Sequence, residues 1–288
     1  MKVLLLGAGG QLGKSIQSNI SDSIHLIKLS KDKLSITNKK ALGEAIKLHH
    51  PDFVINAAGY TNVDAAETEK NQANLVNNLS LHSLVELSNS YNFTLIHFST
   101  DYVFDGKSQH PYLESNEMKP INYYGLSKSL GDRHVIENCN KYYLFRVSWL
   151  YSPFGKNFVK TMIGLATRQS IEIVDNQYGR PTSAVYLSKF LNKLVLGSYK
   201  LEFGVYNFSS SGSEVSWSGF AEEIFANAFK SNLIDSIPEI KNISSEEYNG
   251  AALRPSYSVL SNEKLEKTCK ISFPNWKELL IHDLKLIG

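Results

Sequence analysis

Residues 3–13 read VLLLGAGGQLG, and this stretch decides the fold class of the 288-residue chain. The apolar run 3–6 has the length and composition of a buried strand, and it leads directly into three glycines spaced three residues apart. Gly7 permits a tight turn, Gly10 lets a pyrophosphate approach the backbone, and Gly13 lets the following helix pack close to the strand. Free N–H groups at the start of that helix suit phosphate. The stretch therefore predicts a dinucleotide-binding βαβ unit.

The alternation of strand and helix patterns continues through the first half of the chain. Further apolar runs that we interpret as strands are 25–29, 53–56, 94–98 and 142–147. Amphipathic stretches that we interpret as helices are 11–20, 39–49, 72–92 and 122–138. Such alternation predicts an α/β fold of the Rossmann type, a doubly wound parallel sheet with helices on both faces.

The pattern loosens after about residue 150. Helices are expected at 158–167, 184–196, 217–229 and 276–286, and strands at 171–174 and 205–208. We predict that residues 1–150, with a returning segment of about 183–208, form the dinucleotide-binding domain. Residues of about 151–182 and 209–288 are predicted to form a smaller C-terminal substrate-binding lobe.

Composition narrows the classes of partner. The chain has 30 basic and 28 acidic residues, a net charge of +2, which gives no electrostatic reason to expect nucleic acid or a membrane surface. Two cysteines, Cys139 and Cys269, are too few for a disulfide framework or a cysteine metal site. We therefore expect reduced thiols, no structural metal and a cytoplasmic location.

Tyr124 and Lys128 are the first candidate catalytic pair, because a spacing of four places them on one face of a helix. A tyrosine has an ordinary pKa of about 10, and we expect the nearby ammonium to lower it. The phenol can then donate a proton to a developing alkoxide. Tyr123 competes for the role, but no lysine follows it four residues later.

The third candidate is a hydroxyl at the end of the strand 94–98. Ser99 and Thr100 follow that strand, and ligands of open α/β sheets bind at the carboxyl ends of strands. Either hydroxyl can hydrogen-bond a substrate carbonyl oxygen and polarise it. The sequence leaves the choice between them open.

Two further loops bear on the cofactor. After the second strand the chain carries Ser30 and Lys31 with Lys33 nearby, and no carboxylate at position 30 to bind a ribose 2′-hydroxyl. Lysines here favour the extra phosphate of NADPH, although a solvated polar loop explains them equally well. After the third strand, small residues at 57–59 let a cofactor lie across the sheet edge, with Asn56 holding the turn.

The chain resembles the extended short-chain dehydrogenase/reductases over nearly its whole length. The residues that carry the resemblance are 7–13, NAAGYTNVD at 56–64, STDYVF at 99–104, YGLSK at 124–128, FRVSWLY at 145–151, NFVKTM at 157–162, DNQYGRPT at 175–182 and RPSYSVL at 254–260. The resemblance implies hydride transfer from a nicotinamide to the C4 ketone of a nucleotide-linked 4-keto-6-deoxy sugar. In the branch it matches, dTDP-4-dehydro-L-rhamnose becomes dTDP-L-rhamnose, a precursor of cell-surface polysaccharide.

The resemblance also implies roles for individual residues. Tyr124 would be the acid, Lys128 its tuner and ribose anchor, and Thr100 the carbonyl-binding hydroxyl. Cofactor contacts implied or expected are Gly7, Gly10, Gln11, Leu12, Gly13, Ser30, Lys31, Gly59, Tyr60, Thr61, Phe98, Tyr124 and Lys128. Substrate contacts implied are Thr100, Asp101, Trp149, Asn157 and Arg254, the last two at the diphosphate. Trp149 would stack on the sugar or base, and its alternative is a core aromatic.

The sequence departs from the family at three places. The acids that often follow the second strand and often stand at residues 35–36 are absent, so NADPH is expected and NADH is possible. Ser15 stands where some members carry an acidic residue of a magnesium-bridged dimer, so that dimer is not expected. A monomer or a homodimer is expected instead.

Two alternative functions remain open. The first is a sister reductase for another nucleotide-linked 4-keto-6-deoxy sugar, which would use the same Tyr, Lys and Thr. The second is a non-catalytic nucleotide-binding subunit, like the regulatory subunit of methionine adenosyltransferase, which resembles the same family. Loss of Tyr124 or Lys128 would have favoured the second function, and both residues are present.

Overall fold

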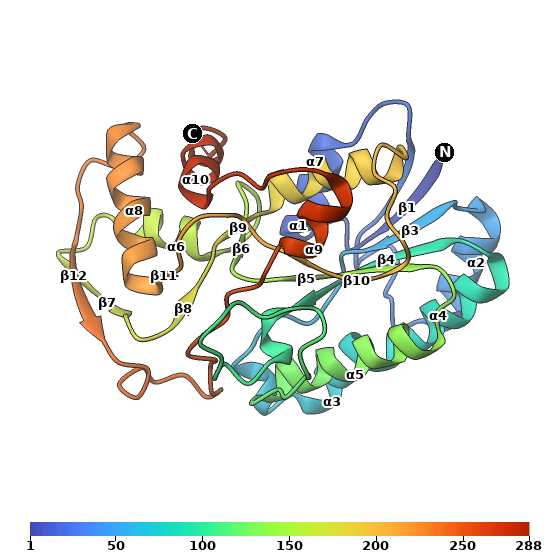
Figure 1. The fold of residues 1–288 in the computed structure, drawn as a ribbon, viewed down its shortest axis with the longest axis horizontal. Helices are drawn as coiled ribbons and strands as arrows, with labels where there is room; N and C mark the ends of the chain where they lie inside the picture. The colour runs from blue at the N-terminus through green and yellow to red at the C-terminus, as the bar shows by residue number, and fades with distance from the viewer. Residues whose placement is uncertain (288) are drawn as a thin grey trace.

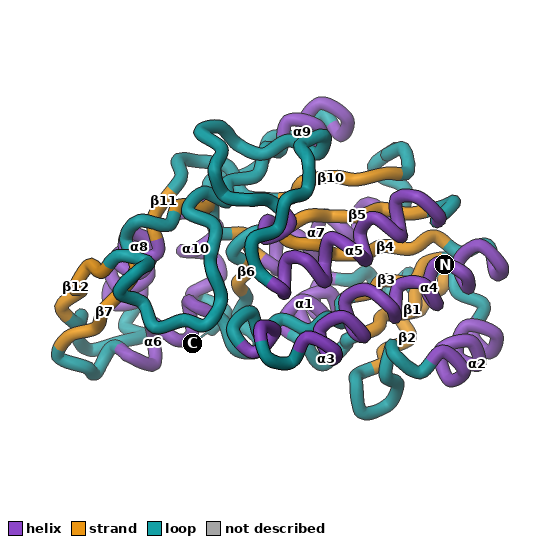
Figure 2. Tube along the Cα trace, turned by 90° about the horizontal axis from the view of Figure 1, so that it is seen from below, coloured by secondary structure: helices purple, strands orange, loops and turns teal. Residues whose placement is uncertain are grey.

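A six-stranded parallel sheet forms the centre of the protein, whose residues 1–287 are described in a computed structural model. Its strands are β1 (Lys2–Leu6), β2 (His25–Leu29), β3 (Phe53–Asn56), β4 (Thr94–Thr100), β5 (Tyr142–Val147) and β10 (Gly204–Phe208). They lie in the order β10-β5-β4-β3-β1-β2, as Figure 2 shows. The chain adds β2 on one side of β1 and then β3 on the other side. The topological switch point therefore lies between β1 and β3.

Alternate side chains of β1 enter two separate cores. Val3 and Leu5 pack with α1 and α7 on one face, and Leu4 and Leu6 pack with α2, α4 and α5 on the other. These helices are α1 (Gln11–Asn19), α2 (Lys39–His49), α4 (Ser80–Tyr91), α5 (Tyr123–Asn138) and α7 (Ala184–Val195). A strand buried on both faces needs an unbroken apolar run, which is what the sequence has there. The predicted doubly wound α/β fold is confirmed.

The segment predicted as one helix over 72–92 is interrupted. It consists of α3 (Lys70–Asn74), a π-helical turn η2 (Leu75–Leu79) and α4. In the wide turn, the buried side chain of Asn77 accepts from the Tyr60 N–H at 2.9 Å and donates to Ser127 Oγ at 3.0 Å. These bonds connect distant parts of the chain, so the local helical pattern could not predict the interruption.

A second group of elements lies to one side of the sheet, at the left of Figure 1. It contains the parallel pair β7 (Ser170–Val174) and β12 (Glu239–Ile243) with the helices α6 (Phe158–Leu165), α8 (Trp217–Lys230) and α10 (Trp276–Leu284). Their apolar faces share a core around Phe220 and Trp276. Shorter pieces are β6 (Leu150–Tyr151), β8 (Tyr178–Gly179), β9 (Thr182–Ser183), β11 (Val215–Ser216) and the 3₁₀ turns η1 (Ala65–Glu67) and η3 (Asp101–Val103).

Besides the two-residue strands β6, β8, β9 and β11, two longer elements of the second half were not predicted. β12 is largely exposed and carries few apolar residues, so its sequence lacks a strand pattern. α9 (Glu263–Cys269) buries one leucine, Leu265, which joins the core of the main sheet together with Phe273. The last eighty residues therefore contribute to the core of the main sheet and also to the core around Phe220 and Trp276. The division into two lobes stays a prediction. None of the helices in the described residues is long and apolar enough to cross a membrane.

Candidate active site

Helix α5 positions Tyr124 and Lys128 at the carboxyl end of β4. Its N-cap is Asn122, whose side chain accepts from the Gly125 N–H at 2.8 Å. The amide of Asn122 also donates to the Leu253 carbonyl at 2.7 Å, which ties the helix start to the C-terminal part of the chain. A side-chain acceptor at this position satisfies an N–H group that the helix leaves free. These two hydrogen bonds of Asn122 therefore fix the start of α5, where Tyr124 lies in the first turn.

Gly125 lets this helix approach the loop after β4. A Cβ added to Gly125 would lie 2.1 Å from the Tyr102 carbonyl oxygen, which no side chain tolerates. With glycine there, the rings of Tyr102 and Tyr124 meet edge to face, 5.5 Å apart at 74°. The close packing holds the Tyr124 ring in one orientation.

Lys128 is buried and its ammonium nitrogen is held on two sides. Nζ donates to the Phe98 carbonyl oxygen at 2.6 Å and lies 3.3 Å from His97 Nε2. Burial lowers the pKa of Lys128 to about 8, and the carboxylate of Asp132 partly opposes that shift. The residue therefore exchanges its proton much closer to neutral pH than an exposed lysine does.

The predicted lowering of the Tyr124 pKa is wrong. Burial raises the pKa of the phenol, a hydrogen bond with Thr100 lowers it in part, and the carboxylates of Asp101 and Asp132 raise it further. Burial disfavours the charged phenolate more than the surrounding groups favour it. The phenol therefore stays protonated at neutral pH, which is the form that a proton donor needs.

The two hydroxyls that end β4 point to different partners. Ser99 donates a short hydrogen bond to the buried carboxylate of Asp132. Thr100 accepts from the Tyr102 N–H at 3.2 Å and donates to Asp101 Oδ1 at 3.0 Å, beside the Tyr124 hydroxyl. The geometry favours Thr100 as the hydroxyl that works with Tyr124.

Asp101 is a buried carboxyl group within the same cluster. Burial raises its pKa to about 7, against the lowering effect of hydrogen bonds from Thr100, backbone N–H groups and Ser258. Its Oδ2 atom is buried and has no hydrogen-bond partner among the described residues. A buried oxygen without a partner is uncommon, which makes Asp101 a candidate contact for a polar group of a bound molecule.

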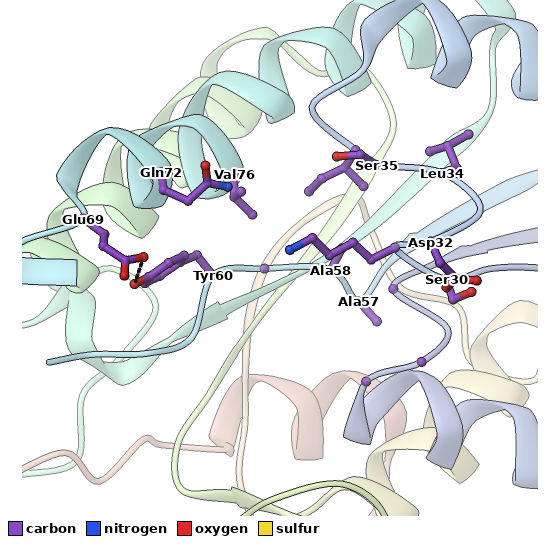
Figure 3. A pocket seen from close by; sticks show the side chains of 16 residues that line it. Ser30, Asp32, Leu34, Ser35, Ala57, Ala58, Tyr60, Glu69, Gln72 and Val76 are labelled. Atoms are coloured by element: carbon purple, nitrogen blue, oxygen red, sulfur yellow. Dashed lines mark hydrogen bonds between the residues drawn. The ribbon is translucent and has the colours of Figure 1, made fainter. Parts of the chain in front are cut away.

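A cavity of about 610 Å³ lies at the carboxyl ends of β1 and β3. Its lining includes six predicted cofactor residues: Gly7, Gly10, Ser30, Lys31, Gly59 and Tyr60. It also includes Ala57 and Ala58, the small residues expected beside a cofactor, and residues that were not predicted as contacts: Gly9, Asp32, Leu34, Ser35, Ile36, Glu69, Gln72 and Val76. In Figure 3 Ser30 and Asp32 lie together at one end, and Tyr60 lies at the other with its hydroxyl bonded to Glu69 at 2.9 Å.

The glycine turn fits a bound pyrophosphate. Gly7 has φ +72°, and a Cβ on Gly13 would lie 2.3 Å from the Gly7 carbonyl oxygen, so α1 packs directly on the turn. The N-cap of α1 is Gly10, and no side chain caps this helix end. The first N–H groups of α1 therefore keep their hydrogen-bonding capacity for an anion.

Seven predicted cofactor residues do not line the cavity: Gly13, Tyr124 and Lys128, described above, and Gln11, Leu12, Thr61 and Phe98. Leu12 is buried in the sheet core, and Gln11 donates to the Leu150 carbonyl at 3.3 Å. Thr61 is exposed, and Phe98 packs in the core while its carbonyl holds Lys128. Contacts from these residues to a cofactor stay predictions.

Asn157 and Arg254, the predicted diphosphate contacts, have protein partners. Asn157 caps α6, accepting from the Lys160 N–H at 3.1 Å and donating to the Ser152 carbonyl at 2.7 Å. Arg254 forms an ion pair with Asp64 at 2.6 Å. Asn157 thus has a capping role and Arg254 joins the C-terminal part of the chain to the loop after β3, while the diphosphate contacts of both residues stay predictions.

Trp149 has a left-handed backbone, φ +47°, and stacks on Trp217 with ring centres 3.5 Å apart. Its Nε1 donates to Ser258 Oγ at 3.1 Å, and a Cβ on Gly179 would lie 2.3 Å from its ring. The ring is partly exposed, yet much of its surface already packs on protein. Stacking of Trp149 on a substrate stays a prediction.

Three buried polar residues beside Ser127 and Lys128 were not predicted from the sequence. They are His97, Asp132 and Asn77, and each is less than 2% exposed. Asp132 follows Lys128 by four residues on α5, a spacing that could have revealed it. His97 and Asn77 lie on other elements, and only the fold brings them near. No group of three or more potential ligands that could hold a metal ion occurs within residues 1–287.

Comparison with known proteins places the chain in a family. The family described as "RmlD substrate binding domain" matches residues 1–286. The chain belongs to this family. It is similar to a dTDP-4-dehydrorhamnose reductase of Burkholderia thailandensis, with 35% identity over 96% of each chain, and to one of Salmonella typhimurium, with 33% identity over 96% of this chain and 95% of the other.

The solved structures agree with the sequence comparison. The structure of a dTDP-4-dehydrorhamnose reductase of Bacillus anthracis in complex with NADP superposes with a TM-score of 0.92. The two chains are 35% identical, and the match covers 99% of each. The resemblance to the extended short-chain reductases that the motifs indicated is thereby confirmed for the whole chain.

Proposed function

We propose that the protein reduces the C4 ketone of dTDP-4-dehydro-L-rhamnose to give dTDP-L-rhamnose, with NADPH as the reductant. The observation that carries the proposal is the grouping of Tyr124, Lys128 and Thr100 at the end of β4. This grouping lies one strand away from the cavity at β3 and β1. Relatives of the same length named dTDP-4-dehydrorhamnose reductase support the substrate.

The cofactor would span three strand ends. Its pyrophosphate would lie on the free N-terminus of α1, its adenosine in the cavity, and its nicotinamide towards Tyr124. NADPH supplies the hydride when bound. Lys31 favours a 2′-phosphate, while Asp32, next to Ser30, brings a carboxylate that suits a free ribose. NADH is therefore assayed as a second reductant beside NADPH.

The residues around the end of β4 would each have a distinct role in the reduction. Tyr124, protonated because burial raises its pKa, would donate a proton to the C4 oxygen as hydride arrives at the carbon. Thr100 would hydrogen-bond the same oxygen. Lys128, fixed by the Phe98 carbonyl, would bind the nicotinamide ribose and balance the phenolate. Asp101 would bind a sugar hydroxyl through its unpartnered oxygen.

The decisive experiment is NADPH oxidation against a panel of dTDP-, UDP- and GDP-linked 4-keto-6-deoxy sugars. We expect dTDP-4-dehydro-L-rhamnose to give the highest kcat/KM, with dTDP-L-rhamnose as product. Faster reduction of another sugar would establish a sister reductase instead. No reduction of any sugar, with nucleotide still bound, would favour the regulatory subunit. Cytoplasmic location and oligomeric state stay predictions.

A further inference from the structure

A chain of three buried polar groups ends at Lys128. Asn56, at the end of β3, places its Nδ2 atom 3.2 Å from His97 Nδ1. His97 Nε2, on the other side of the ring, lies 3.3 Å from Lys128 Nζ. Asn56 and His97 are each 1% exposed and Lys128 is 5% exposed, so these groups have little access to solvent. The protonation state of each side chain must therefore fit the hydrogen bonds that it makes with the next one.

The backbone fixes the direction of these hydrogen bonds. The Ala58 N–H donates to Asn56 at 3.2 Å, and only the amide oxygen can accept it. The amide nitrogen of Asn56 consequently faces His97 Nδ1, and this nitrogen can only donate. Nδ1 therefore accepts, and the proton of a neutral imidazole must be on Nε2. Burial, with the charge of Lys128, lowers the pKa of His97, which favours the neutral ring.

The Nε2–H of His97 therefore points at Lys128. A lysine ammonium has three donors and no lone pair, so it cannot accept this hydrogen bond, whereas the uncharged amine can. The amine can still donate to the Phe98 carbonyl at 2.6 Å. We infer that His97 is a positioning residue for Lys128: Asn56 holds its ring as the Nε2–H tautomer, and this N–H stabilises the amine of Lys128 relative to the ammonium.

Other charged groups act on Lys128 from neighbouring elements. Asp132, on the same helix, favours the ammonium, and Arg146 from β5 favours the charged carboxylate of Asp132, which preserves that effect. Tyr124 stays neutral because burial raises its pKa. From β4 the imidazole of His97 is the titratable group that faces Nζ, beside the neutral Phe98 carbonyl. The contact with His97 thus acts in the same direction as burial and against Asp132.

The consequence for catalysis rests on the proposed reductase function. The ammonium balances the phenolate that Tyr124 becomes after it donates its proton. The pH at which Lys128 loses its proton therefore sets the upper end of the active pH range. His97 brings this pH down towards neutrality, where Lys128 can return a proton to Tyr124 with less cost.

The tautomer can be measured on the unmodified protein. Nitrogen-15 NMR of the histidine side chains distinguishes a protonated ring nitrogen from an unprotonated one, and His97 is assigned through its bonds to the backbone. Between about pH 6 and 8 we expect a protonated Nε2 and an unprotonated Nδ1. A proton on Nδ1, or on both nitrogens, would overturn the inference. This result does not depend on activity or on a variant that folds.

The effect on Lys128 is tested with His97→Gln, whose amide oxygen can accept from the ammonium. We expect the basic limb of the kcat/KM profile to move up by about one pH unit. His25→Gln, at an exposed position on β2, is the matched control and should leave the limb in place. An unmoved limb in His97→Gln would overturn the role. If no form of the protein reduces the sugar, the proposed function fails, and the NMR result still decides the tautomer.

Discussion

Tyr124 and Lys128 are both shifted towards their uncharged forms, and burial is the largest cause for each. The sequence motif suggests a lysine that makes the phenol acidic, yet the packed surroundings raise the pKa of Tyr124 instead. A reductase needs its acid protonated before hydride transfer and needs the phenolate stabilised only afterwards. Burial serves the first need, and a Lys128 that retains its proton serves the second.

Tyr124→Phe removes the proton donor and leaves the ring that packs on Tyr102. We expect kcat to fall by about 10²- to 10⁴-fold, the range of a positioned general acid, with NADPH affinity nearly unchanged. Steady-state kinetics and a cofactor titration measure the two effects. Tyr123→Phe is the control and should keep its turnover. Equal activity of the two variants would remove Tyr124 from the mechanism.

The raised pKa of Asp101 predicts a particular pH dependence of the free energy of unfolding. Its pKa is raised from 3.8 to about 7, so between these values the folded protein holds a proton that the unfolded chain has lost. The free energy of unfolding therefore falls as pH rises through this window, by up to about 1.4 kcal/mol per pH unit, and not further above it.

Asp101→Asn should abolish this contribution. The stability of the variant relative to the parent should rise from about pH 4 to about pH 7 and then level off, as measured by urea unfolding at several pH values. Parallel stability curves for the two proteins would contradict the raised pKa.

The sequence indicated the candidate reacting residues because they lie in short local motifs. Tyr124 and Lys128 share one helix turn, and Thr100 ends a strand. It could not find His97 or Asn77, which meet Lys128 and Tyr60 only through sheet pairing and helix packing. It also predicted a substrate contact for Asn157, which caps α6, and that contact stays a prediction.

At the scale of elements, the contact between β1 and α1 depends on the absence of a side chain at Gly13. A Cβ there would lie 2.3 Å from the Gly7 carbonyl oxygen and 2.8 Å from the Ala8 Cα atom, and backbone cannot yield as a flexible side chain can. The same contact presents the α1 N-terminus to the cavity. Stability and cofactor binding therefore depend on one packing distance.

Gly13→Ala should consequently lower the free energy of unfolding by about 2 kcal/mol or more and weaken NADPH binding at least about tenfold. Gly164→Ala is the matched control, because Gly164 lies on the exposed side of α6 with no atom within 4 Å of an added Cβ. The control should be neutral or stabilise by up to about 1 kcal/mol. Thermal unfolding and a fluorescence titration distinguish them, and similar losses in both would contradict the packing argument.

The strands of the sheet and most helices were predicted because their burial follows a regular period. Elements that lack such a pattern were missed: β12 is mostly exposed, and α9 buries only Leu265. The π-helical turn at 75–79 was missed because it depends on the distant partners of Asn77. Local pattern thus determines an element's type, while interruptions depend on tertiary contacts.

Across the whole molecule, Arg254 joins the C-terminal part of the chain to the loop after β3. The ion pair with Asp64 is partly exposed, with side-chain exposures of 16% and 38%, so it adds little to stability. A guanidinium beside the site suits a diphosphate.

Arg254→Ala should raise the KM for the nucleotide sugar about tenfold or more, with kcat little changed and stability lowered by no more than about 1 kcal/mol. The exposed Arg168 on α6's C-terminal side offers a control in Arg168→Ala, for which no change in KM is expected. An unaltered KM in Arg254→Ala would assign Arg254 to the ion pair alone.

Only the class of the sheet was predicted, and not the order of its strands, because a sequence does not state which strands are neighbours. The order β10-β5-β4-β3-β1-β2 places the glycine turn two strands from the end of β4, with β3 between them. One extended cofactor can reach from one to the other. The proposed chemistry therefore depends on the arrangement of the whole sheet.

The most direct test of the account follows the hydride itself. NADPH deuterated at nicotinamide C4, in separate samples for the two faces of the ring, is incubated with the protein and dTDP-4-dehydro-L-rhamnose. We expect dTDP-L-rhamnose that carries deuterium at sugar C4, from one of the two samples. Unconsumed NADPH, or a product without deuterium at C4 from both samples, would contradict this expectation.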